Sequence, residues 1–379
     1  MSFLEYQARY VPTGLRKFLH LSWPLVLLVS AVSGLGFLML YSVAGGRWDL
    51  YTEPQASRFA LGLAVMFAVA LTPIWVWRRA AWLAYLLSLG LLALVLAIGE
   101  VGMGAQRWLD IGPLRIQPSE MAKIALVMAL AAYYDALPAR RVSNPLWLLP
   151  PIAMILVPAY LVYAQPNLGT VMLILAIGAS MLWCAGVHWL YFAAVFGLVG
   201  GAVFAVFESR GTPWQLLHDY QYSRIDTFLD PSRDPLGEGY NITQAKIALG
   251  SGGWTGRGFM QGTQSRLNFL PEKHTDFIFN TLAEEFGLLG TGLLLVLYLL
   301  ILVFLFVAAM QARDRFSSLL ITGIGVSFFL LFAINMLMVM GMAPVVGLPL
   351  PLVSYGGSQL LVLLAAFGLV QSAIVHRPR

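Results

Sequence analysis

Long apolar runs recur along nearly the whole chain, and they constrain its fold more than any other feature. Each run has about 18 residues or more, enough for a helix to cross about 30 Å of hydrocarbon. Apolar and polar residues do not alternate within the runs, which favours helices over a transmembrane barrel. Only 11% of the residues are charged, whereas soluble domains carry about 25%. The sequence therefore predicts an all-α integral membrane protein.

The polar breaks between these runs predict ten transmembrane helices. We place them at residues 22–44, 57–76, 81–99, 117–134, 147–164, 168–184, 189–207, 275–309, 316–340 and 353–375. Only Gln165 to Asn167 separate the fifth helix from the sixth. The eighth segment is too long for one straight helix, so its first turns are expected to stand above the membrane. No repeat or linker divides the chain, and residues 1–379 are predicted to form a single polytopic membrane domain.

Basic residues in the short connections predict the orientation, because cytoplasmic loops are enriched in Lys and Arg. The side that holds both termini carries eleven of them: Arg9, Arg16, Lys17, Arg78, Arg79, Arg140, Arg141, Arg313, Arg315, Arg377 and Arg379. The opposite short connections carry four: Arg47, Arg58, Arg107 and Arg115. Both termini are therefore predicted in the cytoplasm, with one large extracytoplasmic loop, residues 208–274, between helices seven and eight. The net charge of +5 follows from this asymmetry; since no basic run is interleaved with aromatic residues, no nucleic-acid partner is expected.

The most informative polar segment ends the long loop. Residues 270–279 bring two acids, a lysine and a histidine against the start of an apolar span, where ionisable groups are costly and tend to be functional. The position of Asp276 alone favours a helix-start acid stabilised by the helix dipole. However, Asn280 and Glu284 follow at i+4 and i+8, so a polar stripe descends one helix face. Such a stripe should face a cavity or other helices, and a carboxylate at its mouth can act as a general base.

Glu120 and Lys123 form a second charged group, three residues apart near the start of the fourth span. This spacing places them on one helix face, where a buried ion pair is expected. A structural strut between helices is favoured over a catalytic role. At the start of the last span, Ser354 to Ser358 either allow close helix packing or line the roof of a cavity.

Basic residues of the long loop could hold an anionic headgroup, because arginine binds phosphate bidentately. They are Arg210, Arg224, Lys246, Arg257, Arg266 and Lys273. Each by itself is more simply explained as a solvated surface charge. No cluster of His and Cys offers zinc ligands.

Several motifs, in order along the chain, resemble the SEDS family of cell-wall polymerases (shape, elongation, division and sporulation). They are Gly104 to Asp110, Gln117 to Glu120 with Lys123, Gln165-Pro166 before Leu168 to Thr170, Gly262 to Gln264, Leu270 to Glu272, His274 to Phe277, Glu284-Glu285 and Val353 to Ser358. The resemblance covers essentially the whole chain and is closer to the elongation branch of the family than to its division branch. It also implies ten transmembrane helices, in agreement with the hydropathy pattern.

The resemblance implies a glycosyltransferase that polymerises lipid II into β-1,4-linked glycan strands and releases undecaprenyl pyrophosphate. Its partners would be lipid II, the nascent strand and a class B penicillin-binding protein, which crosslinks the strands. The family's essential acid maps to Asp276, which is expected to take the proton of the acceptor hydroxyl. Charge neutralisation at the pyrophosphate is expected from basic residues, with a divalent cation as a further candidate. The basic candidates are Arg107, Lys246, Arg257 and Arg266.

Structural or cavity-lining roles are expected for nine residues: Glu120, Lys123, Asn167, His274, Thr275, Asn280, Glu284, Ser354 and Ser358. The family usually has an aspartate after Gln-Pro, whereas this chain has Asn167, which cannot ionise; a polar side chain is expected to suffice there. Two other functions suit the pattern of many apolar helices with an internal charged pair. They are a lipid II flippase and a non-catalytic scaffold that anchors a transpeptidase.

Overall fold

The computed structural model describes residues 14, 16–102, 105–111, 114–216, 222, 226, 229–230, 238–266, 272–345 and 347–377. Within these residues, ten helices have 17 residues or more. They are α3 (Trp23–Val43), α4 (Thr52–Leu71), α5 (Ile74–Ile98), α6 (Pro118–Ala136), α7 (Pro145–Tyr163), α8 (Leu168–Cys184), α9 (Trp189–Glu208), α13 (Ile278–Gln311), α14 (Arg315–Val339) and α15 (Gly357–Val375). Each coincides with one predicted span, so the predicted helical membrane fold is confirmed.

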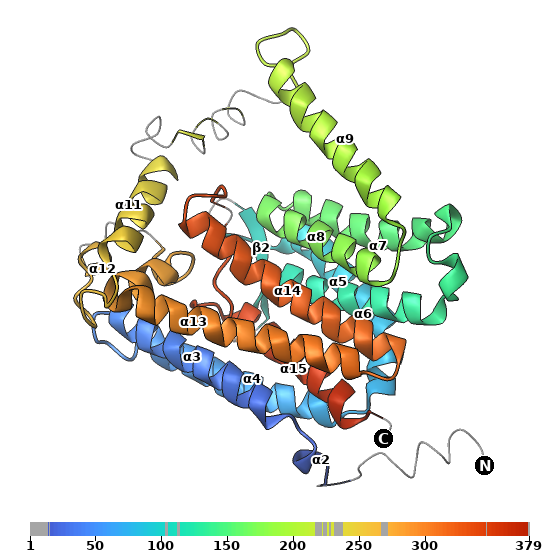
Figure 1. The fold of residues 1–379 in the computed structure, drawn as a ribbon, viewed down its shortest axis with the longest axis horizontal. Coiled ribbons are helices and arrows are strands. Elements are labelled where there is room, and N and C mark those ends of the chain that lie inside the picture. Colours follow the sequence, from blue (N-terminus) through green and yellow to red (C-terminus); the bar gives the residue numbers. More distant parts are fainter. Residues whose placement is uncertain are drawn as a thin grey trace.

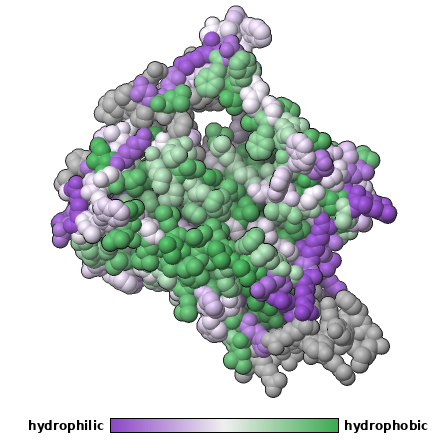
Figure 2. All heavy atoms as spheres, viewed as in Figure 1, coloured by the Kyte–Doolittle hydropathy of each residue, from purple (hydrophilic) through white to green (hydrophobic). Residues whose placement is uncertain are grey.

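Eight of the ten helices are long and apolar enough to cross a membrane. Of the other two, α8 has 17 residues, and α6 carries the charged residues Glu120, Lys123 and Asp135. Figure 2 shows hydrophobic residues over the middle of one face, with hydrophilic residues toward its left and lower right margins. This distribution suits a bundle that is surrounded by lipid at its middle and by water at its ends.

One predicted break between helices was misplaced. The sequence analysis separated the second and third helices near Arg78 and Arg79, but the chain breaks at Thr72 and Pro73. Proline lacks an N–H and disfavours a helical conformation in the residue before it. Thr72 is accordingly extended, with ψ 130°, and Pro73 is the N-cap of α5. The two arginines therefore lie inside α5.

Two predicted irregularities are present. The three residues 165–167 do separate α7 from α8, and the Asn167 side chain caps α8 by accepting from the Thr170 N–H at 3.4 Å. The long eighth helix, α13, is interrupted at Gly287, whose backbone (φ 60°, ψ −155°) is not helical. Glycine suits this position because it lacks the Cβ that makes positive φ unfavourable.

A small sheet was not predicted. Strands β1 (Glu100–Gly102), β2 (Ala105–Ile111) and β3 (Leu114–Ile116) form an antiparallel sheet in the order β1-β2-β3. Strands of three to seven residues produce no long apolar run, so a search for membrane spans passes over them. The remaining elements are short: α2 (Arg16–Leu19), a 3-10 turn (Ala139–Arg141), α11 (Glu238–Ser251) and α12 (Thr263–Arg266).

The long loop returns to the end of the bundle where α13 begins. Figure 1 shows α11 and α12 at this end, while the C-terminus lies at the opposite end. The preceding helix, α9, projects away from the other helices (Figure 1), and none of its residues is buried. The two described helices of the loop, α11 and α12, contact α13.

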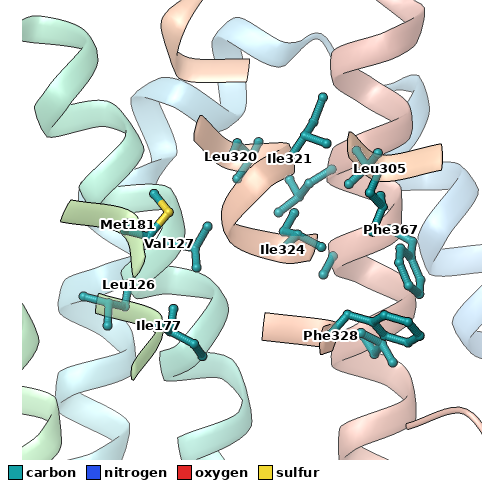
Figure 3. Packing of buried hydrophobic residues seen from close by; sticks show 14 of the residues in the cluster. Leu126, Val127, Ile177, Met181, Leu305, Leu320, Ile321, Ile324, Phe328 and Phe367 are labelled. Atoms are coloured by element: carbon teal, nitrogen blue, oxygen red, sulfur yellow. The ribbon is translucent and has the colours of Figure 1, made fainter. Parts of the chain in front are cut away.

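Part of the core lies where α6, α8, α13, α14 and α15 meet. Figure 3 shows the buried side chains that meet there, among them Leu126, Val127, Ile177, Met181, Leu305, Leu320, Ile321, Ile324, Phe328 and Phe367. Gly323 allows α14 to approach closely, because an added Cβ would lie 2.5 Å from both Met181 Sδ and Val127 Cγ1. Small residues at helix contacts are typical of membrane bundles.

Gly368 provides a test of the packing of α15 on α4. An added Cβ at Gly368 would lie 2.7 Å from the Met66 carbonyl oxygen and 2.9 Å from Val69 Cβ. Gly368→Ala should lower the Tm of the detergent-solubilised protein, because overpacking costs about 1–3 kcal/mol. Gly90→Ala on α5 is the matched control, since nothing lies within 4 Å of its added Cβ. Alanine also favours the helix, so an unchanged or higher Tm is expected there. Equal Tm values for both variants would contradict this packing.

Candidate functional site

Asp276 lies in the turn 272–277, directly before α13. It does not cap that helix, because Phe277 is the N-cap and makes no side-chain capping bond. Burial raises the pKa of the half-buried Asp276 carboxyl to about 6, and the negative charge of Glu272 contributes to the rise. A carboxyl with a pKa in this range is largely ionised near pH 7 and is still basic enough to accept a proton.

The loop that precedes α15 holds the backbone of the turn by hydrogen bonds. The Ser354 hydroxyl donates to the Thr275 carbonyl at 2.5 Å and accepts from the Leu350 N–H at 2.8 Å. The Tyr355 N–H donates to the His274 carbonyl at 2.9 Å. The Ser354 to Ser358 segment therefore contacts the acid-bearing turn directly, and Ser358 is itself buried in the first turn of α15.

His274 and Thr275 make contacts that support the turn. The His274 ring stacks on Tyr51, the N-cap of α4, with ring centroids 4.7 Å apart and planes 13° apart. Its Nε2 lies 3.9 Å from Glu272 Oε2, yet burial lowers the pKa of His274 overall. The Thr275 hydroxyl donates to the Glu272 carbonyl at 3.2 Å. A neutral, stacked His274 suits a supporting role near pH 7.

The polar stripe below Asp276 faces the loop helices. Asn280 and Glu284 are both fully buried. The Asn280 side chain donates to the Ala245 carbonyl of α11 at 2.6 Å. One Glu284 carboxylate oxygen accepts from the Thr263 N–H at 2.7 Å, the Thr263 hydroxyl at 2.9 Å and the Gln264 N–H at 3.1 Å. The stripe was predicted to face either a cavity or other helices. Asn280 and Glu284 face other helices, namely α11 and α12.

The interruption of α13 gives the loop a second attachment. Because the helix is broken at Gly287, carbonyls before it are free to bind elsewhere. The Glu284 carbonyl accepts from the Arg257 N–H at 2.9 Å, and the Leu288 N–H donates to the Gly253 carbonyl at 2.9 Å. The loop backbone thus replaces hydrogen bonds that an unbroken helix would make internally.

Glu120 and Lys123 form the predicted buried ion pair. Their Oε1 and Nζ atoms are 2.8 Å apart, and the residues are 7% and 2% exposed. Both belong to α6, so this bond does not itself join two helices. The two opposite charges of the pair neutralise each other inside the bundle.

The four basic candidates lie on different elements. Arg107 of β2 donates to the Pro166 carbonyl at 2.5 Å, and its buried Nε has no hydrogen-bond partner. Burial lowers the pKa of Arg107. Arg257 donates to the Thr263 hydroxyl at 2.8 Å, which joins it to the Glu284 group. Lys246 of α11 and Arg266 of α12 are exposed.

The described part of the chain contains no preformed site for a divalent cation. Among those residues, no group of three or more His, Cys, Asp or Glu side chains is placed so that it could hold a metal ion. The acidic residues nearest in sequence to Asp276 are Glu272, whose charge acts on it, and Glu284, which binds the loop. No step of the mechanism proposed below depends on a cation.

Two buried amides at the site escaped the sequence analysis. Asn335 of α14 donates to the Asp276 carbonyl at 3.0 Å, and Gln55 of α4 donates to the Ser354 carbonyl at 3.0 Å. Asn335 is a polar residue inside the apolar span 316–340, where polar side chains are rare and face the protein interior. That rule could have singled it out.

These features define a polytopic membrane protein with an acid held on the loop side of its helical bundle. Residues 22–378 match the FtsW, RodA and SpoVE family of cell cycle proteins, and the chain belongs to this family. A protein of Escherichia coli (strain K12), peptidoglycan glycosyltransferase MrdB, is 42% identical over 94% of each chain. A protein of Thiomicrospira cyclica, named probable peptidoglycan glycosyltransferase FtsW, is 37% identical over 91% of this chain and 89% of its own.

Solved structures share the fold. The rod shape determining protein RodA of Thermus thermophilus has a TM-score of 0.70 and 29% identity, over 95% of this chain and 98% of its own. A structure described as the coordination of polymerization and crosslinking by a peptidoglycan synthase complex has a TM-score of 0.79 and 32% identity, over 94% of this chain and 97% of that one. The family that the motifs resemble is thereby confirmed, and the chain is a multi-pass protein of the inner membrane.

The Glu120–Lys123 pair can be tested by thermal unfolding in detergent. Glu120→Ala leaves the Lys123 ammonium buried without its partner and should lower the Tm, since breaking a buried pair costs about 3–5 kcal/mol. The double variant Glu120→Leu/Lys123→Met removes both charges and should recover most of that loss. An unchanged Tm with lost turnover in Glu120→Ala would favour a direct role in the reaction instead.

Proposed function

We propose that the chain is a peptidoglycan glycosyltransferase that polymerises lipid II into β-1,4-linked glycan strands and releases undecaprenyl pyrophosphate. Membership of the family and the shared length with the Escherichia coli glycosyltransferase support this proposal. The observation that carries it is the Asp276 carboxyl, whose pKa is about 6 and whose turn is held by the loop before α15. Elongation and shape maintenance are the proposed cellular role.

In the proposed mechanism Asp276 is the general base. Its carboxylate takes the proton of the acceptor's GlcNAc 4-hydroxyl as that oxygen attacks C1 of the donor's terminal MurNAc. The new C1–O bond forms while the bond from C1 to the pyrophosphate oxygen breaks. Attack from the opposite face inverts C1 and produces the β-1,4 linkage. One base suffices, because pyrophosphate leaves without prior protonation once its charge is neutralised.

Basic side chains are proposed to neutralise the leaving pyrophosphate. Arg107 presents a guanidinium whose Nε is unpaired, and arginine stays protonated in proteins. Lys246, Arg257 and Arg266 are exposed on the loop, where they are open to an anionic ligand. Lipid tails would lie against the apolar helices, while the reacting sugars and phosphates stay at the polar end of the bundle.

We further propose that both termini lie in the cytoplasm and that loop 208–274 faces outward, within one membrane domain. Support comes from the excess of Lys and Arg in the short connections on the terminal side. The loop helices α11 and α12 lie at the end of the bundle opposite the C-terminus (Figure 1). A continuous core from α3 to α15 supports the single domain.

A class B penicillin-binding protein is the proposed partner. The structure of a peptidoglycan synthase complex that polymerises and crosslinks has a subunit with the same fold as this chain. A polymerase that releases uncrosslinked strands at the membrane surface requires a transpeptidase nearby. The partner would therefore act on the product of this chain.

Asp276→Asn tests the base. The amide keeps the size of the carboxyl but cannot accept the proton, so strand synthesis should fall by about 10²–10⁴-fold. The assay uses purified protein, lipid II in detergent and product length on a gel. Near wild-type synthesis by Asp276→Asn would refute the mechanism. Failure of the wild type itself to make strands, with its transpeptidase present, would favour the flippase or scaffold function.

The pH dependence provides an independent test. Only the ionised carboxylate accepts a proton, so kcat/KM should rise with pH through a midpoint near the Asp276 pKa of about 6 and be lost below it. Glu272→Gln removes the negative charge that helps to raise this pKa, so the midpoint should move to lower pH. A midpoint that stays in place in Glu272→Gln would assign the titration to another group.

A further inference from the structure

Asn335 of α14 connects the Asp276 turn to the loop before α15. It is fully buried, and its side-chain amide donates to two carbonyls at once. One belongs to Asp276, at 3.0 Å, and the other to Leu348, at 2.7 Å. A single amide therefore ties together two segments that are far apart in the sequence.

The same loop runs beside the Asp276 carboxylate. Gly347 has a φ of 65°, and an added Cβ there would lie 3.6 Å from Asp276 Oδ2. The loop backbone is thus in van der Waals reach of the carboxylate. Asn335 therefore binds on both sides of this contact, to the residue after Gly347 and to Asp276 itself.

Consecutive carbonyls of the turn 274–276 are all bonded in this way. Tyr355, Ser354 and Asn335 supply the three donors, in that order. The loop itself is anchored to the bundle, because the buried Tyr298 hydroxyl donates to the Pro351 carbonyl at 2.7 Å. The turn is therefore bonded to a loop that is itself anchored to α13.

We propose that Asn335 is a positioning residue for the reaction: with Ser354, it fixes the backbone of Asp276 so that the carboxylate meets the acceptor hydroxyl in a productive geometry. This inference rests on the proposed function of Asp276 as base. Asn335 donates to the backbone carbonyl of Asp276 and acts through that residue.

The hydrogen bonding of Asn335 is poorly explained by stability alone. Its Oδ1 atom is buried and has no hydrogen-bond partner. A buried polar atom without a partner costs about 1–3 kcal/mol, which offsets part of the stabilisation from the two bonds that the amide donates. A position that tolerates such a loss is typical of a functional site.

Asn335→Leu tests the proposal, because it fills similar space and removes both donors. The kcat for strand synthesis should fall by about 10–100-fold, since a displacement of about 1 Å at a reacting group has an effect of that size. The KM for lipid II should change by less than about twofold, because substrate contacts remain.

Gln371→Leu is the matched control for a purely structural role. Gln371 is also a fully buried amide, and it clamps a backbone segment by accepting from the Ser22 N–H at 2.8 Å and donating to the Ser22 carbonyl at 2.9 Å. It lies near the end of α15, away from the Asp276 turn. Both variants should lower the Tm, but Gln371→Leu should keep the wild-type kcat well below its Tm. A kcat in Asn335→Leu equal to that of Gln371→Leu would overturn the proposal.

Ser354→Ala decides the matter if Asn335→Leu does not fold. This smaller change removes the hydroxyl that donates to the Thr275 carbonyl. As for Asn335→Leu, kcat should fall while KM stays unchanged. An unchanged kcat in Ser354→Ala would reject the positioning role.

Failure of the proposed function can be distinguished from failure of the positioning role, because it would appear as an active Asp276→Asn variant. An inactive Asp276→Asn with a fully active Asn335→Leu would keep the base and reject the positioning role.

Discussion

The hydrocarbon interior of a membrane offers no hydrogen-bond partners, and the structure is organised around that constraint. A polar group that enters the bundle is costly unless it finds a partner within the protein. Lys123 binds Glu120, Tyr298 binds a loop carbonyl, and Asn280 binds α11. Polar side chains within the spans therefore act as attachment points, and several of them converge on the segments that surround Asp276.

Interruptions of regular structure make the site possible. The turn before α13, the broken backbone at Gly287 and the irregular loop before α15 all expose carbonyl or N–H groups. Loop and side-chain partners satisfy these groups at the polar end of the bundle. A straight, fully bonded helix would have no backbone group left in its middle with which to hold the loop. The acid is thus placed by backbone contacts, and burial at that place raises its pKa.

Much of this could be predicted, because helix formation in a membrane follows local hydropathy. Ten spans and the extra length of the eighth helix were readable from the apolar runs. Hydropathy places the break after α4 at the two arginines, which are the most polar residues there, but the structure places it at Pro73 because a proline interrupts the backbone more strongly. The sheet at 100–116 was missed because its strands are too short to leave a hydropathy signal.

Asp276 was prominent in the sequence because an ionisable residue beside a span stands out against apolar neighbours. Its surroundings were not readable there. Asn335 and Ser354 lie 59 and 79 residues from the carbonyls that they bind, and no local pattern specifies such pairs. The sequence by itself determined the membrane class, the helices and the acid, since these depend on the chemistry of neighbouring residues. Only the tertiary structure decided which polar groups hold that acid, because hydrogen bonds between distant segments exist only once the helices have packed.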